Sequence, residues 1–408
     1  MAATPDPLET ARSYWDRIRG RYPEVRALIL RNPLADFVPG ISDLDLRLVA
    51  DPDPEGDWQA LTEAVAEVHL ERLSEGPAMW RLLEHPPGAC VTLGEALSSQ
   101  LFHPEMRQWQ RCCGDAATLD LLEDHIATAP WSAQDDLYWE RRLRGYLGPW
   151  GPPEDRINLA AGMGNRYRLH ALLMLHTLPA LQAAYCLLHQ KAVPGKAAAL
   201  KAWQALRPGD PLLTELADML ATGFRSHLHI RPEALEALQG RCRRLVDEVA
   251  AEALKRGSQR GPERPAGDGA HQPVLDLFDA VRYSRMRPAH YRSFLLAPEG
   301  FQVDFFLVNE VATLRRSIVE PVVRALWSPG QRLGTGDREA ESDPLRRLCR
   351  TGPEERAVTA ALIAARASPS PAEARQILGR LLGLYPLFHR VLERALAANC
   401  YSPRPDSV

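Results

Sequence analysis

The chain lacks long apolar runs, a signal-peptide-like start and cysteines at metal-binding spacing. No apolar run in the 408-residue chain approaches the roughly 20 residues that a membrane-spanning helix needs. The N-terminus has neither the basic nor the apolar region of a signal peptide. The seven cysteines form no CxxC pattern, which argues for reduced thiols and against a zinc site. We therefore expect a cytoplasmic protein without membrane association.

Lysine is the scarcest charged residue, and three of the four lysines lie within residues 191–201. The four are Lys191, Lys196, Lys201 and Lys255. The net charge of −3 at pH 7 excludes a protein whose main role is to coat nucleic acid, although it is compatible with a local basic groove.

The length and composition predict several globular domains. Hydrophobic residues make up 45% of the chain and charged residues 25%, as in globular proteins, and 408 residues are enough for two or three cores. Residues 1–150 are predicted to form one domain and residues 151–254 an α-helical domain that lines its cleft. Residues 255–273 are predicted to be a flexible linker, because glycine, proline and charge dominate there. Residues 274–408 complete the chain as a second helical region.

The predicted elements begin with a helix over residues 8–21, a buried strand over residues 25–30 and a helix over residues 58–73. A short strand is predicted over residues 79–85. The second half of the chain reads as nearly all helical, with helices predicted at residues 168–188, 196–206, 212–222, 232–254, 274–283, 304–326, 354–367 and 371–398.

The most informative segment is residues 40–49, Gly-Ile-Ser-Asp-Leu-Asp-Leu-Arg-Leu-Val. In an extended strand, side chains at positions i and i+2 point to the same face, so Asp43 and Asp45 should project together. Two such carboxylates repel unless a cation lies between them, which suggests a Mg²⁺ site that also takes phosphates. The alternative is an exposed Asp-x-Asp pair that caps a turn.

This order of elements resembles the core of the DNA polymerase β-type nucleotidyltransferase superfamily. In that family a strand ends in Gly-Ser and a loop of about ten residues leads to Asp-x-Asp on the next strand; here ten residues separate Asn32 from Asp43. Residues 39–46 are similar to the Ser-Asp-Ile-Asp-Leu signature of antibiotic and minimal nucleotidyltransferases. Residues 81–84, Arg-Leu-Leu-Glu, resemble the Arg-Ala-Leu-Glu of streptomycin-type adenylyltransferases. Where the family has Gly-Ser, this chain has Arg31-Asn32.

The resemblance implies an α+β fold, with an N-terminal nucleotidyltransferase-type mixed sheet flanked by helices and a mainly α-helical domain after it. It implies Mg²⁺ bound by Asp43, Asp45 and Glu84, with Glu84 as the catalytic base. Glu95 is the second choice for the third carboxylate.

The resemblance also implies a set of nucleotide-binding residues. Guanidinium and amide groups donate hydrogen bonds to phosphate oxygens, and a lysine at a helix N-terminus can hold an anion. The residues expected to bind nucleotide are Arg31, Asn32, Ser42 and Lys196, assisted by Lys191 or Lys201.

The expected function is therefore transfer of a nucleoside monophosphate from a nucleoside triphosphate, expected to be ATP, to an acceptor hydroxyl by a Mg²⁺-dependent two-metal mechanism. The acceptor is a small molecule, an RNA or a protein, with no membrane partner. The alternative is a catalytically degenerate nucleotidyltransferase-like domain, in which the change to Arg31-Asn32 has disabled triphosphate binding. Such a domain would act as a nucleotide-sensing or protein-interaction module.

Overall fold

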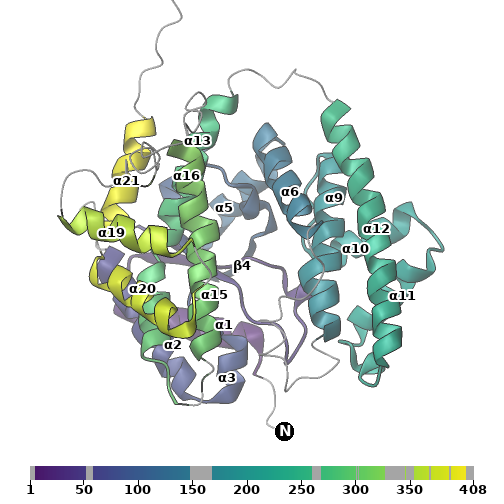
Figure 1. The fold of residues 1–408 in the computed structure, drawn as a ribbon, viewed down its shortest axis with the longest axis horizontal. Helices are drawn as coiled ribbons and strands as arrows, with labels where there is room; N and C mark the ends of the chain where they lie inside the picture. The colour runs from purple at the N-terminus through teal and green to yellow at the C-terminus, as the bar shows by residue number, and fades with distance from the viewer. Residues whose placement is uncertain are drawn as a thin grey trace, which may run out of the picture.

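The structure is a computed structural model, and it contains a small sheet surrounded by many helices. It describes residues 5–51, 58–147, 168–259, 268–299, 301, 303–326, 345, 353–366, 369–385 and 387–400. The predicted α+β class is confirmed. The helices form two lobes on either side of the sheet domain (Figure 1).

The sheet has four strands in the order β3-β2-β1-β4. They are β1 (Val25–Leu30), β2 (Leu46–Ala50), β3 (Ala89–Val91) and β4 (Gln110–Gly114). Strand β1 runs antiparallel to both β2 and β4, whereas β2 and β3 are parallel, so the sheet is mixed as predicted. Strands β1 and β2 are the central pair and are almost entirely buried, which explains why both read as apolar runs.

Alternate side chains of the central strands enter two different cores, as the twofold repeat of a strand requires. Leu28 and Leu48 pack with α1 (Pro7–Arg21) and α2 (Trp58–Ser74). Ile29 and Val49 face the opposite side, toward α5 (Ala116–Thr128). We call residues 5–128 the sheet domain.

Two expectations for this domain are wrong in detail. Residues 79–85 are not a strand, because α3 (Pro77–Leu82) covers the first half of this segment. The helix begins at Pro77, since Gly76 turns the chain at φ 107° and proline suits a first helical position. Strand β2 begins at Leu46, so Asp43 and Asp45 lie just before it. Helix α5 was not predicted.

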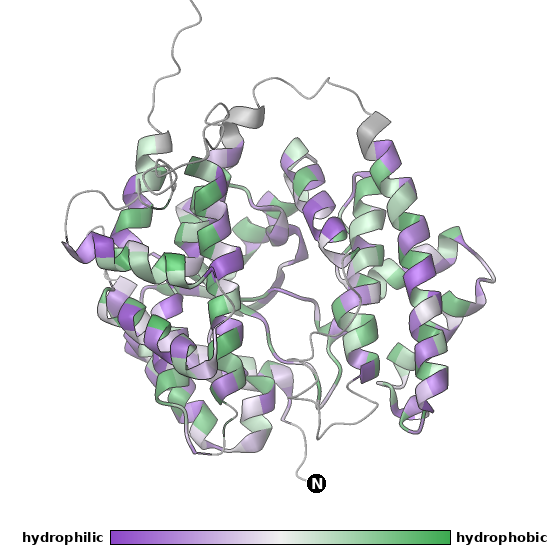
Figure 2. Cartoon of the chain, viewed as in Figure 1, coloured by the Kyte–Doolittle hydropathy of each residue, from purple (hydrophilic) through white to green (hydrophobic). Residues whose placement is uncertain are grey.

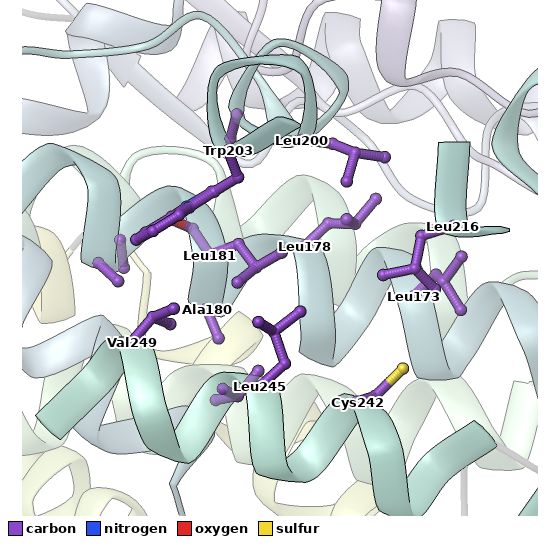
Figure 3. Close-up of a cluster of buried hydrophobic side chains, with 14 of the residues drawn as sticks. Leu173, Leu178, Ala180, Leu181, Leu200, Trp203, Leu216, Cys242, Leu245 and Val249 are labelled. Atoms are coloured by element: carbon purple, nitrogen blue, oxygen red, sulfur yellow. The ribbon is translucent and has the colours of Figure 1, made fainter. Parts of the chain in front are cut away.

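The helical lobe consists of residues 133–147 and 168–259. Its elements are α6 (Ala133–Tyr146), a π-helical turn over Ala171–Thr177, α9 (Leu178–His189), α10 (Lys196–Leu206), α11 (Pro211–Ala221) and α12 (Pro232–Gln259). In its core, leucines of α9 pack between α12 and Trp203 of α10, whose indole N–H donates to the Leu181 carbonyl at 2.9 Å (Figure 3). Trp139 and Leu143 of α6 are fully buried in the same core, although the predicted division places them in the first domain.

The C-terminal lobe consists of the described residues from 268 to 400. Its elements are α13 (Asp268–Ser284), α14 (Arg287–Leu295), α15 (Val303–Leu314), a π-helical turn over Arg315–Val319, α16 (Glu320–Leu326), α19 (Pro353–Ala364), α20 (Pro371–Gly383) and α21 (Leu387–Cys400). Residues 371–398 thus form two helices and not the single one predicted, and α14 was not predicted. Helices α12 and α13 extend into both ends of the predicted linker, whose residues 260–267 lie outside the described residues.

The lobe helices show the pattern of amphipathic helices. Apolar and hydrophilic residues alternate along the outer helices of both lobes (Figure 2), as expected where one side is buried and the other meets water. Among the described residues, the segment Arg168–His189 alone is long and apolar enough to cross a bilayer, and 83% of its apolar 18-residue window is buried inside the protein. That burial is typical of a core helix.

The fold predicts a large difference between two leucine truncations. Leu28→Ala removes a fully buried side chain from the central strand β1 and should lower the free energy of unfolding by about 2–5 kcal/mol. Leu121→Ala, on the exposed side of α5, is the control, because 51% of that side chain is exposed, and it should change stability by less than about 0.5 kcal/mol. Urea denaturation of both variants measures the difference; equal losses would contradict this assignment of the core.

Candidate functional site

A cavity of about 630 Å³ lies between the sheet domain and the two helical lobes. The sheet domain contributes Asn32 and Asp45, the helical lobe Lys196, and the C-terminal lobe Arg287 and Phe306. Two smaller cavities share lining residues with it: one of about 90 Å³ that reaches Asp43 and Ser42, and one of about 210 Å³ toward α6 and α13. Asp45 therefore borders the space between all three parts of the fold, and Asp43 borders the adjoining cavity of about 90 Å³.

Asp43 and Asp45 do converge on one point, together with a histidine that the sequence analysis did not select. One ligand atom each from Asp43, Asp45 and His85 lies within 4.8 Å of the other two. The Nε2 atom of His85 is 3.4 Å from the Asp43 carboxylate and 3.8 Å from that of Asp45. Leu44, between the aspartates, is buried on the opposite side, so the predicted i, i+2 arrangement holds although β2 has not yet begun.

His85 is fixed from the C-terminal lobe and held in its charged form by the aspartates. Its ring stacks on that of His290, with centroids 5.5 Å apart and planes 19° from parallel. Burial disfavours the imidazolium, but the hydrogen bond and charge of Asp43, together with Asp45, outweigh it and raise the pKa of His85 to about 9. At neutral pH, His85 therefore supplies a positive charge between the carboxylates.

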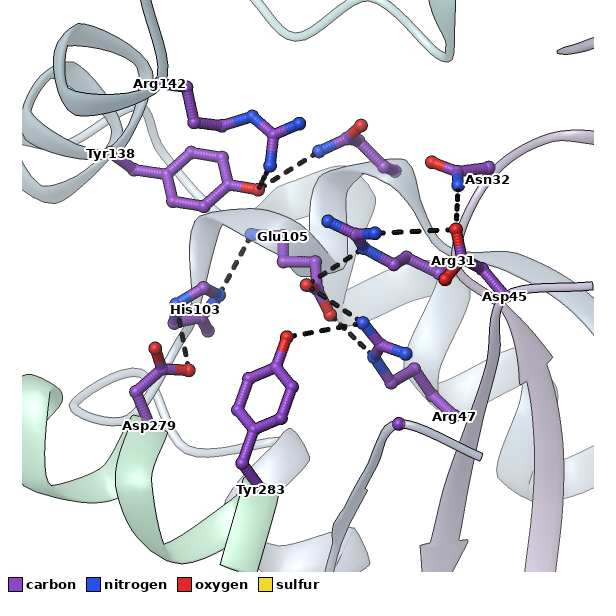
Figure 4. Close-up of polar contacts among 12 residues, drawn as sticks. Arg31, Asn32, Asp45, Arg47, His103, Glu105, Tyr138, Arg142, Asp279 and Tyr283 are labelled. Carbon is purple, nitrogen blue, oxygen red and sulfur yellow. Dashed lines mark hydrogen bonds and ion pairs between the residues drawn. The ribbon is translucent and has the colours of Figure 1, made fainter. Parts of the chain in front are cut away.

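Asp45 is also contacted by Arg31 and Asn32. These two residues stand where the nucleotidyltransferase superfamily has Gly-Ser. The Asn32 amide donates to the Asp45 carboxylate at 2.6 Å, and the Arg31 guanidinium lies 3.5 Å from the same oxygen (Figure 4). Burial opposes ionisation of Asp45, but the charges of Arg31 and His85 prevail and lower its pKa. Arg31 and Asn32 thus contact an aspartate and also line the cavity of about 630 Å³.

Behind this pair lies Glu105, a buried carboxylate held by three arginines, of which Figure 4 shows Arg31 and Arg47. Arg47 of β2 donates to it at 2.9 and 3.3 Å, Arg31 at 3.1 Å and Arg282 of α13 at 3.4 Å. Burial would disfavour the carboxylate, but Arg47, Arg282 and Arg31 hold the pKa of Glu105 well below its usual range. No motif in the sequence marks Glu105, because its partners come from distant parts of the chain.

The two candidates for a third carboxylate differ in position. Glu84 precedes His85, and its side chain is about one quarter exposed, 4.0 Å from Arg81. Burial and the charge of Asp43 raise the pKa of Glu84 to about 8, so the two carboxyl groups interact. Glu95 instead caps α4 (Leu93–Ala96) and forms a bidentate ion pair with Arg285 at 2.6 and 2.8 Å, which is a structural role.

The start of α10 is occupied by a carboxylate of the protein itself. Asp36 accepts hydrogen bonds from the backbone N–H groups of Lys196 and Ala197, both at 2.8 Å, so this helix N-terminus is not open to a phosphate. Gly195, at φ +87°, permits the contact, because a Cβ there would lie 2.8 Å from Asp36. Lys196 still lines the cavity through its side chain.

Of the other predicted nucleotide-binding residues, Ser42 lies beside the aspartates and the two lysines do not. Lys191 and Lys201 are exposed, and neither lines the cavities around Asp43 and Asp45. The Ser42 hydroxyl accepts from the Val38 N–H at 3.0 Å and lies 3.3 Å from His170, which fixes the loop before the aspartates.

The residues Asp43, Asp45 and His85 form the only group of three potential ligands that converge among the described residues. Mg²⁺ is usually held by one or two carboxylates and completes its octahedron with water and phosphate oxygens, so the aspartate pair fits it. An imidazole ligand is more typical of Mn²⁺ or Zn²⁺. Binding of Mg²⁺ by the aspartates would therefore replace His85 as the neutralising charge.

No protein-family model, curated protein or solved structure matches this chain. The likeness to the nucleotidyltransferase superfamily accordingly stays a prediction from the residues quoted above.

The Glu105 cluster predicts a pH-dependent loss of stability. Because the folded-state pKa of Glu105 is depressed, the ionised carboxylate stabilises the fold above the usual glutamate value of 4.5, and this stabilisation is lost as the pH falls through the folded pKa. Glu105→Gln leaves two buried arginines and the partly exposed Arg31 without their shared partner, and should lower the free energy of unfolding at pH 7 by about 3–5 kcal/mol. Urea denaturation from pH 7 to pH 3 should show the difference between wild type and variant shrinking with acidity.

Glu123→Gln is the matched control for this measurement, because Glu123 pairs with Arg111 on an exposed surface. It should change stability by less than about 1 kcal/mol at any pH. A pH-independent difference between wild type and Glu105→Gln would refute the electrostatic role.

Proposed function

We propose that this protein is a nucleotidyltransferase that moves a nucleoside monophosphate from ATP or another nucleoside triphosphate to an acceptor hydroxyl. One observation carries the proposal: the carboxylates of Asp43 and Asp45 converge, and Asp45 lines a cavity of about 630 Å³ that Arg31 and Lys196 also line. A paired carboxylate with adjacent cations around an enclosed space is the arrangement that phosphoryl transfer requires, since positioning and charge neutralisation supply most of its rate.

In this proposal Asp43 and Asp45 hold Mg²⁺, which when bound neutralises phosphate charge and lowers the pKa of the acceptor hydroxyl. Lys196 and Arg31 bind the triphosphate, and the α14–α15 side of the cavity encloses the nucleotide. The acceptor oxygen forms a new bond to the α-phosphorus, the bond to pyrophosphate breaks in line with it, and the hydroxyl proton passes to Glu84. Glu84 directly precedes His85 and is partly open to solvent, but it lines none of the three cavities described. Because its pKa is raised to about 8, Glu84 can accept the proton only above neutral pH, where its ionised form is populated.

A second candidate function is favoured by the surroundings of Asp45. Arg31, Asn32 and His85 already supply the hydrogen bonds and positive charge that this carboxylate needs. A site balanced by its own side chains is stable without a cation, as expected of a degenerate nucleotidyltransferase-like domain that acts in sensing or in protein interaction.

Calorimetry separates these two functions. Titration with ATP, GTP, CTP and UTP in the presence of Mg²⁺ should show micromolar binding of at least one nucleotide if the protein is an enzyme, with release of pyrophosphate. Absence of binding by all four would leave the degenerate domain as the better account.

The catalytic proposal predicts the effect of removing one carboxylate charge. Asp43→Asn should reduce incorporation of labelled nucleoside monophosphate by more than about 100-fold, because losing even an outer-shell partner of a metal ligand costs 10–100-fold. The free energy of unfolding should change by less than about 1 kcal/mol, because Asp43 is partly exposed and its loss removes both the ion pair with His85 and the repulsion with Asp45.

Asp120→Asn is the matched control, because Asp120 is an exposed aspartate on α5 paired only with surface arginine. Labelled incorporation by this variant should equal that of wild type. Undiminished turnover in Asp43→Asn would refute the proposal.

A further inference from the structure

The cleft between the two helical lobes is strongly cationic, although the protein as a whole carries a charge of −3. Nine arginine and lysine side chains line the cavities of about 630 and 210 Å³, against five carboxylates. The two cavities share Arg31, Arg142 and Tyr283, so they form one continuous cleft. A cation excess confined to a concave surface concentrates anionic ligands there.

Part of this excess comes from Arg142 on α6. Its guanidinium donates to the hydroxyl group of Tyr138 at 3.2 Å (Figure 4) and to that of Tyr146 at 3.1 Å, and among the described residues it forms no ion pair. Its Nε atom is buried without a hydrogen-bond partner. A guanidinium directed into a cleft without a carboxylate is a binding group for an anion.

The remaining excess of positive charge lies on the other walls of the cleft. Arg141 of α6 and Arg324 of α16 reach toward each other across the cleft and share a single carboxylate, Asp276, at 3.3 and 3.0 Å. Both arginine side chains are about 40% exposed and so are accessible to a ligand. Lys196 forms no ion pair among the residues described and lies on the side of Asp45, whose ionisation it favours.

The smaller cavity points away from the aspartates, because it includes Arg141, Arg324 and Tyr138 but neither Asp43 nor Asp45. A triphosphate bound at Asp45 and Lys196 would therefore leave Arg142, Arg141 and Arg324 for a second anionic molecule. Tyr138, Tyr146 and Tyr283 line the same walls. Cations that follow a groove with interspersed aromatic rings are typical of binding sites for single-stranded nucleic acid.

We propose that the acceptor is a single-stranded nucleic acid, whose backbone phosphates bind Arg142, Arg141 and Arg324 while its terminal hydroxyl reaches Asp43 and Asp45. This inference rests on the proposed nucleotidyl transfer for its chemistry, although binding can be tested without it. The same charges exclude a polycationic aminosugar, because it would meet like charges along the whole cleft.

The test is fluorescence anisotropy with a labelled 12-nucleotide single-stranded RNA, with the same sequence as DNA in a second arm. Wild type should bind the RNA or DNA with an affinity that falls steeply with salt. Arg142→Gln should weaken binding about fivefold at 0.1 M salt and reduce the slope of log affinity against log salt by about 0.7, the loss of one phosphate contact. Arg142→Lys, which keeps the charge, should retain most of the affinity.

Arg144→Gln is the matched control. Arg144 lies two residues after Arg142 on the same helix, but it pairs with Glu140 on the exposed side. It should bind like wild type. Absence of binding by both oligonucleotides, or equal binding by Arg142→Gln and wild type, would overturn the inference. The difference between the RNA and DNA arms identifies which nucleic acid is preferred.

The proposed function can fail separately. If wild type binds the oligonucleotide but neither wild type nor Asp43→Asn extends it with labelled nucleotide, the binding inference stands and the transfer proposal fails. If wild type instead labels a cationic small molecule and binds no oligonucleotide, transfer stands and this inference fails.

Discussion

The buried contact between Glu105 and its three arginines is the interaction on which the rest of the site depends. Arg31 follows β1, Arg47 lies on β2 and Arg282 comes from α13, so one carboxylate links the central strands to the C-terminal lobe. Each arginine would be costly to bury alone, and together they are tolerable only around a shared anion. This cluster therefore holds the cleft walls at a defined separation and directs Arg31 toward Asp45.

The aspartates before β2 are a candidate cation site that positive groups of the protein itself already surround. His85, Arg31 and Asn32 surround Asp45 with positive charge and hydrogen-bond donors. A metal ion must compete with these groups, while His85 is fixed by its stacking on His290 from the opposite lobe. The C-terminal lobe thus contacts the candidate metal site through the ring of His290.

Positive charge in this protein is concentrated on the walls of the cleft and does not follow the division into domains. Arginines from α6, α13 and α16, which are far apart in the chain, face a common cleft, whereas the outer helix surfaces carry balanced pairs such as Arg144 with Glu140. An anionic ligand would be drawn to the cleft and would bridge the two lobes. The tyrosines along it already stack with arginines, which keeps the cationic groups fixed in orientation.

The sequence by itself determined the paired aspartates, the apolar strand β1 and most helices of the second half, because these follow from local periodicity and spacing. It misassigned residues 79–85, where Gly76 and Pro77 start a helix, and merged α20 with α21. Only the tertiary structure brings His85 to the aspartate pair and places Asp36 at the start of α10. It also brings three arginines into contact with Glu105. These contacts join residues far apart in the chain, and such pairings depend on packing geometry, which no local pattern encodes.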